Sequence, residues 1–219
     1  LWLMVITYLP GRVGIFLRYR YWKGRLKHLG VNVLIDTGIY FQNPGFISID
    51  DNCWIDKNVI VLAGPDSSGR EIIALENKAY PGEPGVVHIG KRVHVGPGCT
   101  ISGIAAGVFI GDDCGVSAHT KIYAFSHHYR SKKNPSDTSV IFSPLVAHDK
   151  QCLMRGPVAI GDNTGIALNV VILPGVAIAK NCFVAINSVV FRGSYPQNSV
   201  LAGNPAKRVD DRYKVETPA

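Results

Sequence analysis

Aliphatic residues return at every sixth position along much of this chain. The longest such ladder consists of Ile160, Ile166, Ile172, Ile178, Val184 and Val190, and shorter ladders begin at Ile49, Ile89 and Ile110. A helix face repeats about every 3.6 residues and a half-buried strand about every 2. A period of six held in phase fits neither. It predicts a stacked solenoid whose short strands turn a corner in each repeat.

A second position keeps the same period. Four residues after the ladder positions, the side chains are small or β-branched, as in Cys53, Val59, Cys99, Thr120, Thr164 and Cys182. We expect the large aliphatic side chain to fill the interior and this small one to share it where the walls converge. The position directly after the ladder residue is often Gly, Ala, Ser or Asp. We expect it to form the corner, where a residue must be small or adopt an unusual backbone angle.

The repeat is similar to that of the hexapeptide-repeat acyltransferase superfamily, in which an aliphatic residue and a small or acidic one precede a second small residue. The stretch 160–207, which ends in Gly203-Asn204-Pro205-Ala206-Lys207, resembles the C-terminal portion of that family. The resemblance covers about residues 31–207 and implies an all-β fold, a left-handed parallel β-helix with three hexapeptides in each triangular coil. Left-handed winding runs against the usual right-handed crossover, so it rests on the resemblance and not on the periodicity.

The ladders divide the chain into one solenoid domain, residues 31–206, with a segment at each end and two insertions. The insertions span residues 62–88 and 123–157, and the second is long enough to indicate a functional, protruding loop. Residues 207–219 are expected to form a tail. The apolar stretch at residues 1–6 is far shorter than the roughly 20 residues of a membrane-spanning helix, although an anchor upstream of Leu1 stays open.

The N-terminal segment, residues 1–30, contains six basic residues and no acidic one. Residues 12–29 predict a basic, aromatic helix that packs on the open end of the prism, contacts an anionic membrane surface, or does both. The other 189 residues hold 17 basic and 16 acidic residues, which argues against a stripe that binds nucleic acid. We therefore expect a cytoplasmic protein, either in solution or at the inner face of the membrane.

Five cysteines raise the question of disulfides or a metal site. Cys53, Cys99, Cys114 and Cys182 occupy the small inward position, where a free cysteine behaves as a small apolar residue. The chain has no Cys-x-x-Cys pair, so structural packing in a reducing compartment is the simpler interpretation. Cys152 lies outside the ladders, and its role stays open.

Acyl transfer from a thioester needs a group that removes a proton from the acceptor, and a neutral histidine suits this task. His127 follows the ladder residue Ile110 by 17 positions, at the point where the chain leaves for the long loop. In the sugar O-acetyltransferases of the resembling family the catalytic histidine has this spacing, and residues 126–129 match their Ser-His-x-Tyr motif. The resemblance therefore implies that His127 is the general base, with an ordinary surface histidine as the alternative. The competing histidines are His128 and, more weakly, His119 and His148.

The resemblance also implies a site for acetyl-CoA, the acyl donor of that family, along the coil edges. The matched positions are Leu168 and Ile186 (main-chain contacts to the pantetheine arm), Phe191 and Arg192 (beside the arm and the phosphates) and Lys207 (after the Gly-Asn-Pro-Ala motif). Arginine and lysine suit phosphates, although Arg192 and Lys207 could equally be solvated surface bases. Where the family has a Gly-Ala-Gly corner, this chain reads Ala185-Ile186-Asn187, which leaves the details of the groove open.

Together these features predict an acyltransferase that moves an acetyl group from acetyl-CoA to a sugar hydroxyl in surface polysaccharide biosynthesis. The resemblance implies a homotrimer whose active site lies between subunits, and no metal is expected. Alternatives on the same scaffold are N-acetylation of a nucleotide-linked amino sugar and acetylation of an antibiotic. More remote are a zinc enzyme like the carbonic anhydrases with this prism, which needs three converging histidines, and a non-catalytic scaffold.

Overall fold

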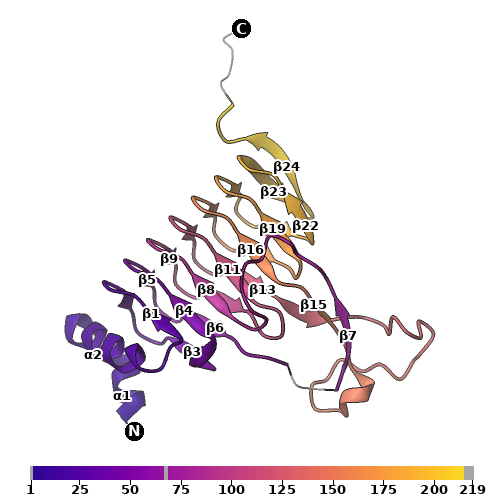
Figure 1. Cartoon of the computed structure of the whole chain (residues 1–219), viewed down its shortest axis with the longest axis horizontal. Coiled ribbons are helices and arrows are strands. Elements are labelled where there is room, and N and C mark those ends of the chain that lie inside the picture. Colours follow the sequence, from indigo (N-terminus) through magenta and orange to yellow (C-terminus); the bar gives the residue numbers. More distant parts are fainter. Residues whose placement is uncertain (1, 67–68, 215–219) are drawn as a thin grey trace.

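The computed structural model describes residues 2–66 and 69–214 of the chain. Three parallel sheets run along a stack of coils, and the coils contribute one short strand to each sheet in turn (Figure 1). Two helices lie at the N-terminal end of the stack, and a pair of antiparallel strands lies at the C-terminal end. The predicted all-β solenoid of parallel strands is therefore confirmed.

The chain passes through the three sheets in a fixed order, named here A, B and C. Sheet A consists of β1 (His28–Leu29), β4 (Ile47–Ile49), β8 (Val87–Ile89), β11 (Val108–Ile110), β16 (Val158–Ile160), β19 (Val176–Ile178) and β22 (Gly193–Tyr195). Sheet B consists of β2 (Leu34–Ile35), β5 (Trp54–Ile55), β9 (His94–Val95), β12 (Gly115–Val116), β17 (Gly165–Ile166), β20 (Phe183–Val184), β23 (Ser199–Gly203) and β24 (Ala206–Asp211). Sheet C consists of β3 (Tyr40–Gln42), β6 (Ile60–Leu62), β10 (Thr100–Ser102), β13 (Lys121–Tyr123), β18 (Val171–Ile172) and β21 (Val189–Val190). The turns form three edges, A–B, B–C and C–A, and a short 3-10 turn, η1 (Pro44–Phe46), follows β3.

The aliphatic ladders point into the prism. In sheet A, Ile49, Ile89, Ile110 and Ile160 lie in register on successive strands, and all four are fully buried. The corresponding residues of sheets B and C join them in one core that runs through the stack. Burial of apolar surface is the main stabilising term in folding, so the six-residue period is the pattern that holds this fold together.

The small inward residues also bond one coil to the next. Cys99 Sγ lies 3.1 Å from the carbonyl oxygen of Ser117. Thr120 Oγ1 donates to the carbonyl oxygen of Ala167 at 3.1 Å. A buried polar group needs such a partner, so this position accepts Cys, Ser or Thr as readily as Val.

All five cysteines are buried and free of disulfides. Burial raises the pKa of Cys53, Cys99 and Cys114 to about 11, and it also raises the pKa of Cys152 and Cys182. The thiols are therefore neutral near pH 7 and poor nucleophiles. The packing role predicted for the four ladder cysteines is confirmed, and Cys152, in a strand outside the prism, is buried as well.

The residue with an unusual backbone angle at each corner lies two positions further along the chain than predicted. The left-handed conformation occurs three positions after the ladder residue, mostly at asparagine, as in Asn52, Asn58, Asn163, Asn169, Asn181 and Asn187. Asparagine tolerates this conformation better than most residues, and Asn169 Nδ2 donates to Asn187 Oδ1 in the next coil at 2.8 Å. The position directly after the ladder residue is small for another reason. A Cβ on Gly90 would lie 2.6 Å from Asp112 Oδ1 of the next coil.

The N-terminal helix is shorter than predicted. Two helices, α1 (Trp2–Tyr8) and α2 (Gly11–Lys23), stand in place of one helix over residues 12–29, and residues 28–29 form β1 of the first coil. Helix α2 stops before Gly24, and Leu29 then enters the core. The solenoid therefore begins before residue 31. Neither helix, nor any other among the described residues, has the length and apolar character needed to cross a membrane.

Helix α2 covers the open end of the stack, as predicted. Trp22 is 8% exposed and meets Phe41 edge-on, with ring centroids 4.9 Å apart. Arg18 is also buried: its Nε donates to the carbonyl oxygen of Ile35, and its Nη1 donates to those of Ile6 and Leu9, each at 2.8 Å. One guanidinium thus ties the end of α1 to the first coil, where the carbonyl oxygens of a helix end favour a cation.

The chain after the last coil is also ordered. β24 runs antiparallel to β23 and pairs with it from Ala206 to Asp211. The tail predicted for residues 207–219 therefore begins as a strand of sheet B, while residues 215–219 lie outside the described residues.

Candidate active site

Both insertions leave the prism at the C–A edge, and they pair with each other. β7 (Glu71–Ala74) of the first insertion lies parallel to β15 (Cys152–Arg155) of the second, and β14 (Phe125–His127) pairs with β15 on its other side (Figure 1). We name these three strands the insertion sheet. The sequence predicted two separate loops, whereas the structure joins them into one arm beside the C–A edge.

The insertion sheet is tied back to the prism. Leu75 N donates to the carbonyl oxygen of Arg155 at 2.7 Å, which continues the pairing beyond β7. Asn77 Nδ2 lies 2.9 Å from the carbonyl oxygens of both Pro157 and Val176, at the start of two successive strands of sheet A. The first insertion is therefore fixed to the coils that follow the second one.

A carboxylate holds the turn that follows β14. Ser131 Oγ donates to Glu71 Oε2 at 2.6 Å, and the backbone N–H groups of Lys132 and Lys133 donate to Glu71 Oε1 at 2.8 and 3.1 Å. The hydrogen bond from Ser131, helped by the two backbone donors, holds the pKa of the Glu71 carboxyl below its usual range. Glu71 thereby sets the position of Lys132.

His127 is the last residue of β14, and its side chain is exposed. The next residue, His128, is more constrained: its ring stacks on Tyr129 with centroids 4.5 Å apart. His128 Nδ1 lies 2.7 Å from the carbonyl oxygen of Arg130, so this nitrogen must carry the proton and donate it. The structure thus leaves the His127 ring open to an approaching molecule and engages that of His128.

The two weaker histidine candidates lie elsewhere. His119 occupies a corner of the B–C edge, with a φ of 60°. His148 begins a 3-10 turn, η2 (His148–Lys150), within the second insertion. Neither lies where β14 leaves the prism.

An open groove of about 950 Å³ lies between the first insertion and the C–A edge. Its lining includes three cationic side chains and one acidic one, contributed by Lys78, Lys132, Arg192 and Glu76. Several positive charges around one space suit phosphate groups. The sequence indicated Arg192 alone. Lys78 and Lys132 lie in insertions without a repeat, and only the pairing of β7 with β15 brings them to this groove.

The predicted cofactor residues lie at two different edges. Leu168 and Ile186 are exposed residues of the B–C edge, one coil apart, whereas Phe191 and Arg192 follow β21 at the C–A edge. Lys207 lies in β24, next to β23 of sheet B. Sheet C separates the two edges, so one chain does not bring all five residues together.

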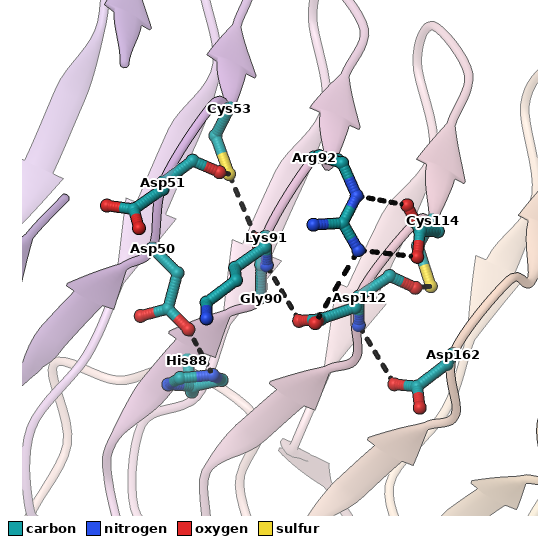
Figure 2. Close-up of polar contacts among 11 residues, drawn as sticks. Asp50, Asp51, Cys53, His88, Gly90, Lys91, Arg92, Asp112, Cys114 and Asp162 are labelled. Carbon is teal, nitrogen blue, oxygen red and sulfur yellow. Dashed lines mark hydrogen bonds and ion pairs between the residues drawn. The ribbon is translucent and has the colours of Figure 1, made fainter. Parts of the chain in front are cut away.

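The A–B edge carries another polar cluster, and its contacts join one coil to the next (Figure 2). Lys91 N donates to Asp112 Oδ1 at 2.8 Å, and Asp112 N donates to Asp162 Oδ1 at 2.9 Å. Arg92 forms two hydrogen bonds with Asp113, at 2.5 and 2.8 Å. In this cluster, aspartate carboxylates accept hydrogen bonds from backbone N–H groups at the corners of the preceding coils. Within residues 2–66 and 69–214, no three His, Cys, Asp or Glu side chains are placed to hold a metal ion.

Curated relatives match more than half of the chain, although no protein-family model matches it. A protein of Escherichia coli named as a lipopolysaccharide biosynthesis O-acetyl transferase, WbbJ, is 35% identical over 133 residues, which cover 61% of this chain and 64% of WbbJ. A protein of the same species named as a colanic acid biosynthesis acetyltransferase, WcaF, is 29% identical over 133 residues, covering 58% and 71%. The chain thus spans less than two thirds of the length of WbbJ.

Solved structures resemble the whole fold. AntD, an N-acyltransferase from Bacillus cereus solved with dTDP and 3-hydroxybutyryl-CoA, has a TM-score of 0.68 at 20% identity and covers 89% of this chain and 88% of its own. The hexapeptide-repeat acetyltransferase VCA0836 from Vibrio cholerae, solved with acetyl-CoA, has a TM-score of 0.55 at 19% identity and covers 96% and 83%. The chain thus shares its fold with these solved acyltransferases, and the curated relatives that its sequence resembles are named as acetyltransferases.

Proposed function

We propose that the protein transfers an acetyl group from acetyl-CoA to a sugar hydroxyl in the assembly of a surface polysaccharide. The C–A edge carries this proposal, because an exposed histidine lies there on the same insertion sheet that walls a cationic groove. The names of WbbJ and WcaF support a saccharide acceptor. The complex of VCA0836 with acetyl-CoA supports the donor.

Acetyl transfer from a thioester requires few catalytic groups from the protein. Acetyl-CoA supplies an activated thioester when bound, so the protein must bind and orient the reactants and move one proton. His127 acts as the general base: a ring nitrogen accepts the proton of the sugar hydroxyl as its oxygen attacks the thioester carbon. His127 then returns the proton to the departing sulfur. Its exposed position at the end of β14 leaves room for the acceptor.

The groove at the C–A edge fits the phosphates of coenzyme A. Lys78, Lys132 and Arg192 bring three positive charges around one open space, and charge-assisted hydrogen bonds are the strong contacts to phosphate. Phe191, which is 45% exposed beside Arg192, provides an apolar surface for the pantetheine arm.

We further propose a homotrimer of left-handed coils in which each active site combines two edges. A threefold axis parallel to the stack would place the C–A edge of one subunit against the B–C edge of the next. Leu168, Ile186 and Lys207 of one subunit would then face the groove of its neighbour. Sheet C would face the axis, where Tyr40 and Ile60, which are 55% and 37% exposed in the single chain, would be covered.

We also propose that the reaction takes place at the cytoplasmic face of the membrane. The basic residues among residues 12–29 would contact anionic headgroups there, since juxtaposed lysine and arginine side chains are attracted to that leaflet.

N-acylation of a nucleotide-linked amino sugar is the second candidate. It is favoured by the likeness to AntD, a structure of which holds dTDP-4-amino-4,6-dideoxyglucose and coenzyme A. Acetylation of an antibiotic is a third, since a protein named as a macrolide acetyltransferase from Lysinibacillus sphaericus is 37% identical over 67 residues.

Turnover of acetyl-CoA against saccharides, nucleotide-linked amino sugars and macrolides separates these candidates. We expect release of free thiol with a saccharide acceptor and an alkali-labile ester in the product. An alkali-stable amide on an amino sugar would replace the proposal with the second candidate. A protein that binds coenzyme A but releases thiol with none of these acceptors would contradict all three.

A further inference from the structure

The two N-terminal helices lie at one end of the stack (Figure 1), and they expose apolar side chains. Their exposed fractions range from 44% to 69%, and the residues are Leu3, Met4, Val5, Tyr8, Val13 and Phe16. Helices α1 and α2 contact each other, so these side chains gather on one small unit. We name the six residues the cap surface. Single exposed apolar residues are ordinary, whereas a group of them marks an interaction site.

Helix α2 divides into two faces. Gly14, Arg18 and Trp22 recur every four residues and form the buried face that packs on the first coil. Phe16 and Arg20, also four residues apart, are exposed. The outward face therefore combines an aromatic side chain with a basic one, as helices that lie in a membrane interface do.

The segment that carries the cap surface holds charge of one sign. Residues 1–30 contain six bases and no acid. Arg18 is buried and Lys27 pairs with Glu83 at 2.9 Å. The remaining bases, Arg12, Arg20, Lys23 and Arg25, occupy exposed positions. Exposed apolar side chains and exposed bases on one short segment complement a bilayer whose acyl chains lie beneath anionic headgroups.

The cap surface is held in a fixed orientation. The guanidinium of Arg18 bonds to carbonyl oxygens of Ile6, Leu9 and Ile35. Burial lowers the pKa of Arg18, and the nearby Asp36 opposes this effect. A buried charge costs desolvation unless it is well bonded, and these bonds serve to attach α1 to the first coil. The apolar side chains of α1 are thus presented on a rigid end and not on a loose tail.

We propose that the cap surface docks the prism onto an anionic lipid bilayer. Met4, Tyr8 and Phe16 enter the interface, and the four exposed bases contact the headgroups. The inference rests on the proposed function, because it states where the acceptor is met: as a saccharide carried by a lipid in that bilayer. It extends the sequence prediction for residues 12–29 by assigning the apolar contact to α1 and the first turns of α2.

Co-sedimentation of the full chain with lipid vesicles tests this proposal. We expect binding to vesicles of phosphatidylcholine with phosphatidylglycerol, little binding to phosphatidylcholine alone, and weaker binding at high salt. A double variant, Met4→Asp with Phe16→Asp, should bind at least tenfold more weakly. Val209→Asp is the matched control, since Val209 is 61% exposed on β24 at the other end of the stack. Thermal unfolding of each variant checks that the fold is intact.

The following outcomes distinguish the proposal from its alternatives. Failure of the wild-type protein to bind anionic vesicles, or equal binding by the double variant and the control, would overturn the proposal. A smaller oligomeric mass in the double variant, with no vesicle binding by the wild type, would assign the cap surface to contact between copies of the chain. The double variant should acetylate a soluble saccharide like the wild type. Vesicle binding by a protein that transfers no acetyl group would keep this inference and refute the proposed function.

Discussion

Two adjacent histidines on the insertion sheet differ in what surrounds their rings. His127 is exposed, whereas His128 Nδ1 donates to the carbonyl oxygen of Arg130 at 2.7 Å. His127→Ala should therefore lower kcat by about 10²- to 10⁴-fold, the usual contribution of a general base, with the affinity for coenzyme A unchanged. Steady-state kinetics with acetyl-CoA and calorimetric binding of coenzyme A measure the two effects.

His128→Ala is the matched control for this experiment. It removes the ring that stacks on Tyr129, so a small loss of stability is expected with most of the activity retained. A larger loss of kcat in His128→Ala than in His127→Ala would identify His128, and not His127, as the general base. Full activity in both variants would exclude the mechanism.

Arg192 and Lys132 reach the same groove from different parts of the chain. Replacing either by alanine should weaken coenzyme A binding roughly ten- to hundredfold, the usual effect of losing one hydrogen bond to a charged group, with the melting temperature nearly unchanged. Lys57→Ala, at an exposed corner of the B–C edge, should bind like the wild type. Unchanged calorimetric affinity in both groove variants would place the phosphates elsewhere.

At the scale of elements, the turn at residues 131–133 depends on one carboxylate. The pKa of Glu71 is lowered by the Ser131 hydroxyl and two backbone N–H groups, so their stabilising effect is present above the ordinary carboxyl pKa. It is lost as the pH falls through the lower pKa of the folded state. We expect Glu71→Gln to raise KM for acetyl-CoA severalfold while leaving kcat unchanged, because Lys132 is no longer held in the groove.

The pH dependence distinguishes this role from a merely structural one. In the wild type, KM for acetyl-CoA should rise on acidification below about pH 4, and in Glu71→Gln this rise should be absent. Glu83→Gln is the control, since Glu83 lies in the same insertion but pairs with Lys27. A proportional fall of kcat in Glu71→Gln would contradict the assignment.

Most elements could be predicted from the sequence because their side chains repeat. The ladder through Ile49 and Ile89 predicts which residues form the core, because each coil buries its aliphatic residue in the same way. The end of α2 could not be predicted, because Leu29 fits a helix stripe as well as a first coil. The prediction of His127 as the general base rests on its spacing from Ile110 together with the family resemblance. No repeat spacing predicts where Lys78 and Lys132 lie. Their position depends on pairing between β7 and β15, which are about 80 residues apart in the sequence.

At the scale of the whole molecule, the division of the predicted site residues between two edges is the basis of the proposed homotrimer. Light scattering should give three times the mass of the chain. Tyr40→Glu with Ile60→Glu, on the outer face of sheet C, should reduce that mass and the activity together. Thr100, on the next strand of the same face, provides a Thr100→Ser control. A monomeric and fully active wild type would contradict the shared site.

The proposed docking through the cap surface would fix how far the active site lies from the bilayer. β16, which follows the insertion sheet, lies four strands from β1 in sheet A, a distance of about 19 Å at the usual strand spacing. On vesicles, lipid-linked saccharides of several units should therefore be acetylated much faster than a lipid-linked monosaccharide. In detergent solution the difference should shrink. Equal rates on vesicles would show that the prism does not stand on its N-terminal end.

The burial of all five thiols has a practical consequence for spectroscopy. Alkylating and spin-labelling reagents attack thiolates, and these thiols are both covered and neutral at working pH. A cysteine introduced at Leu145, which is 93% exposed in the second insertion, would react selectively without removal of the native ones. With a single nitroxide on each subunit, the proposed homotrimer would give one inter-label distance, because threefold symmetry makes all three label pairs equivalent.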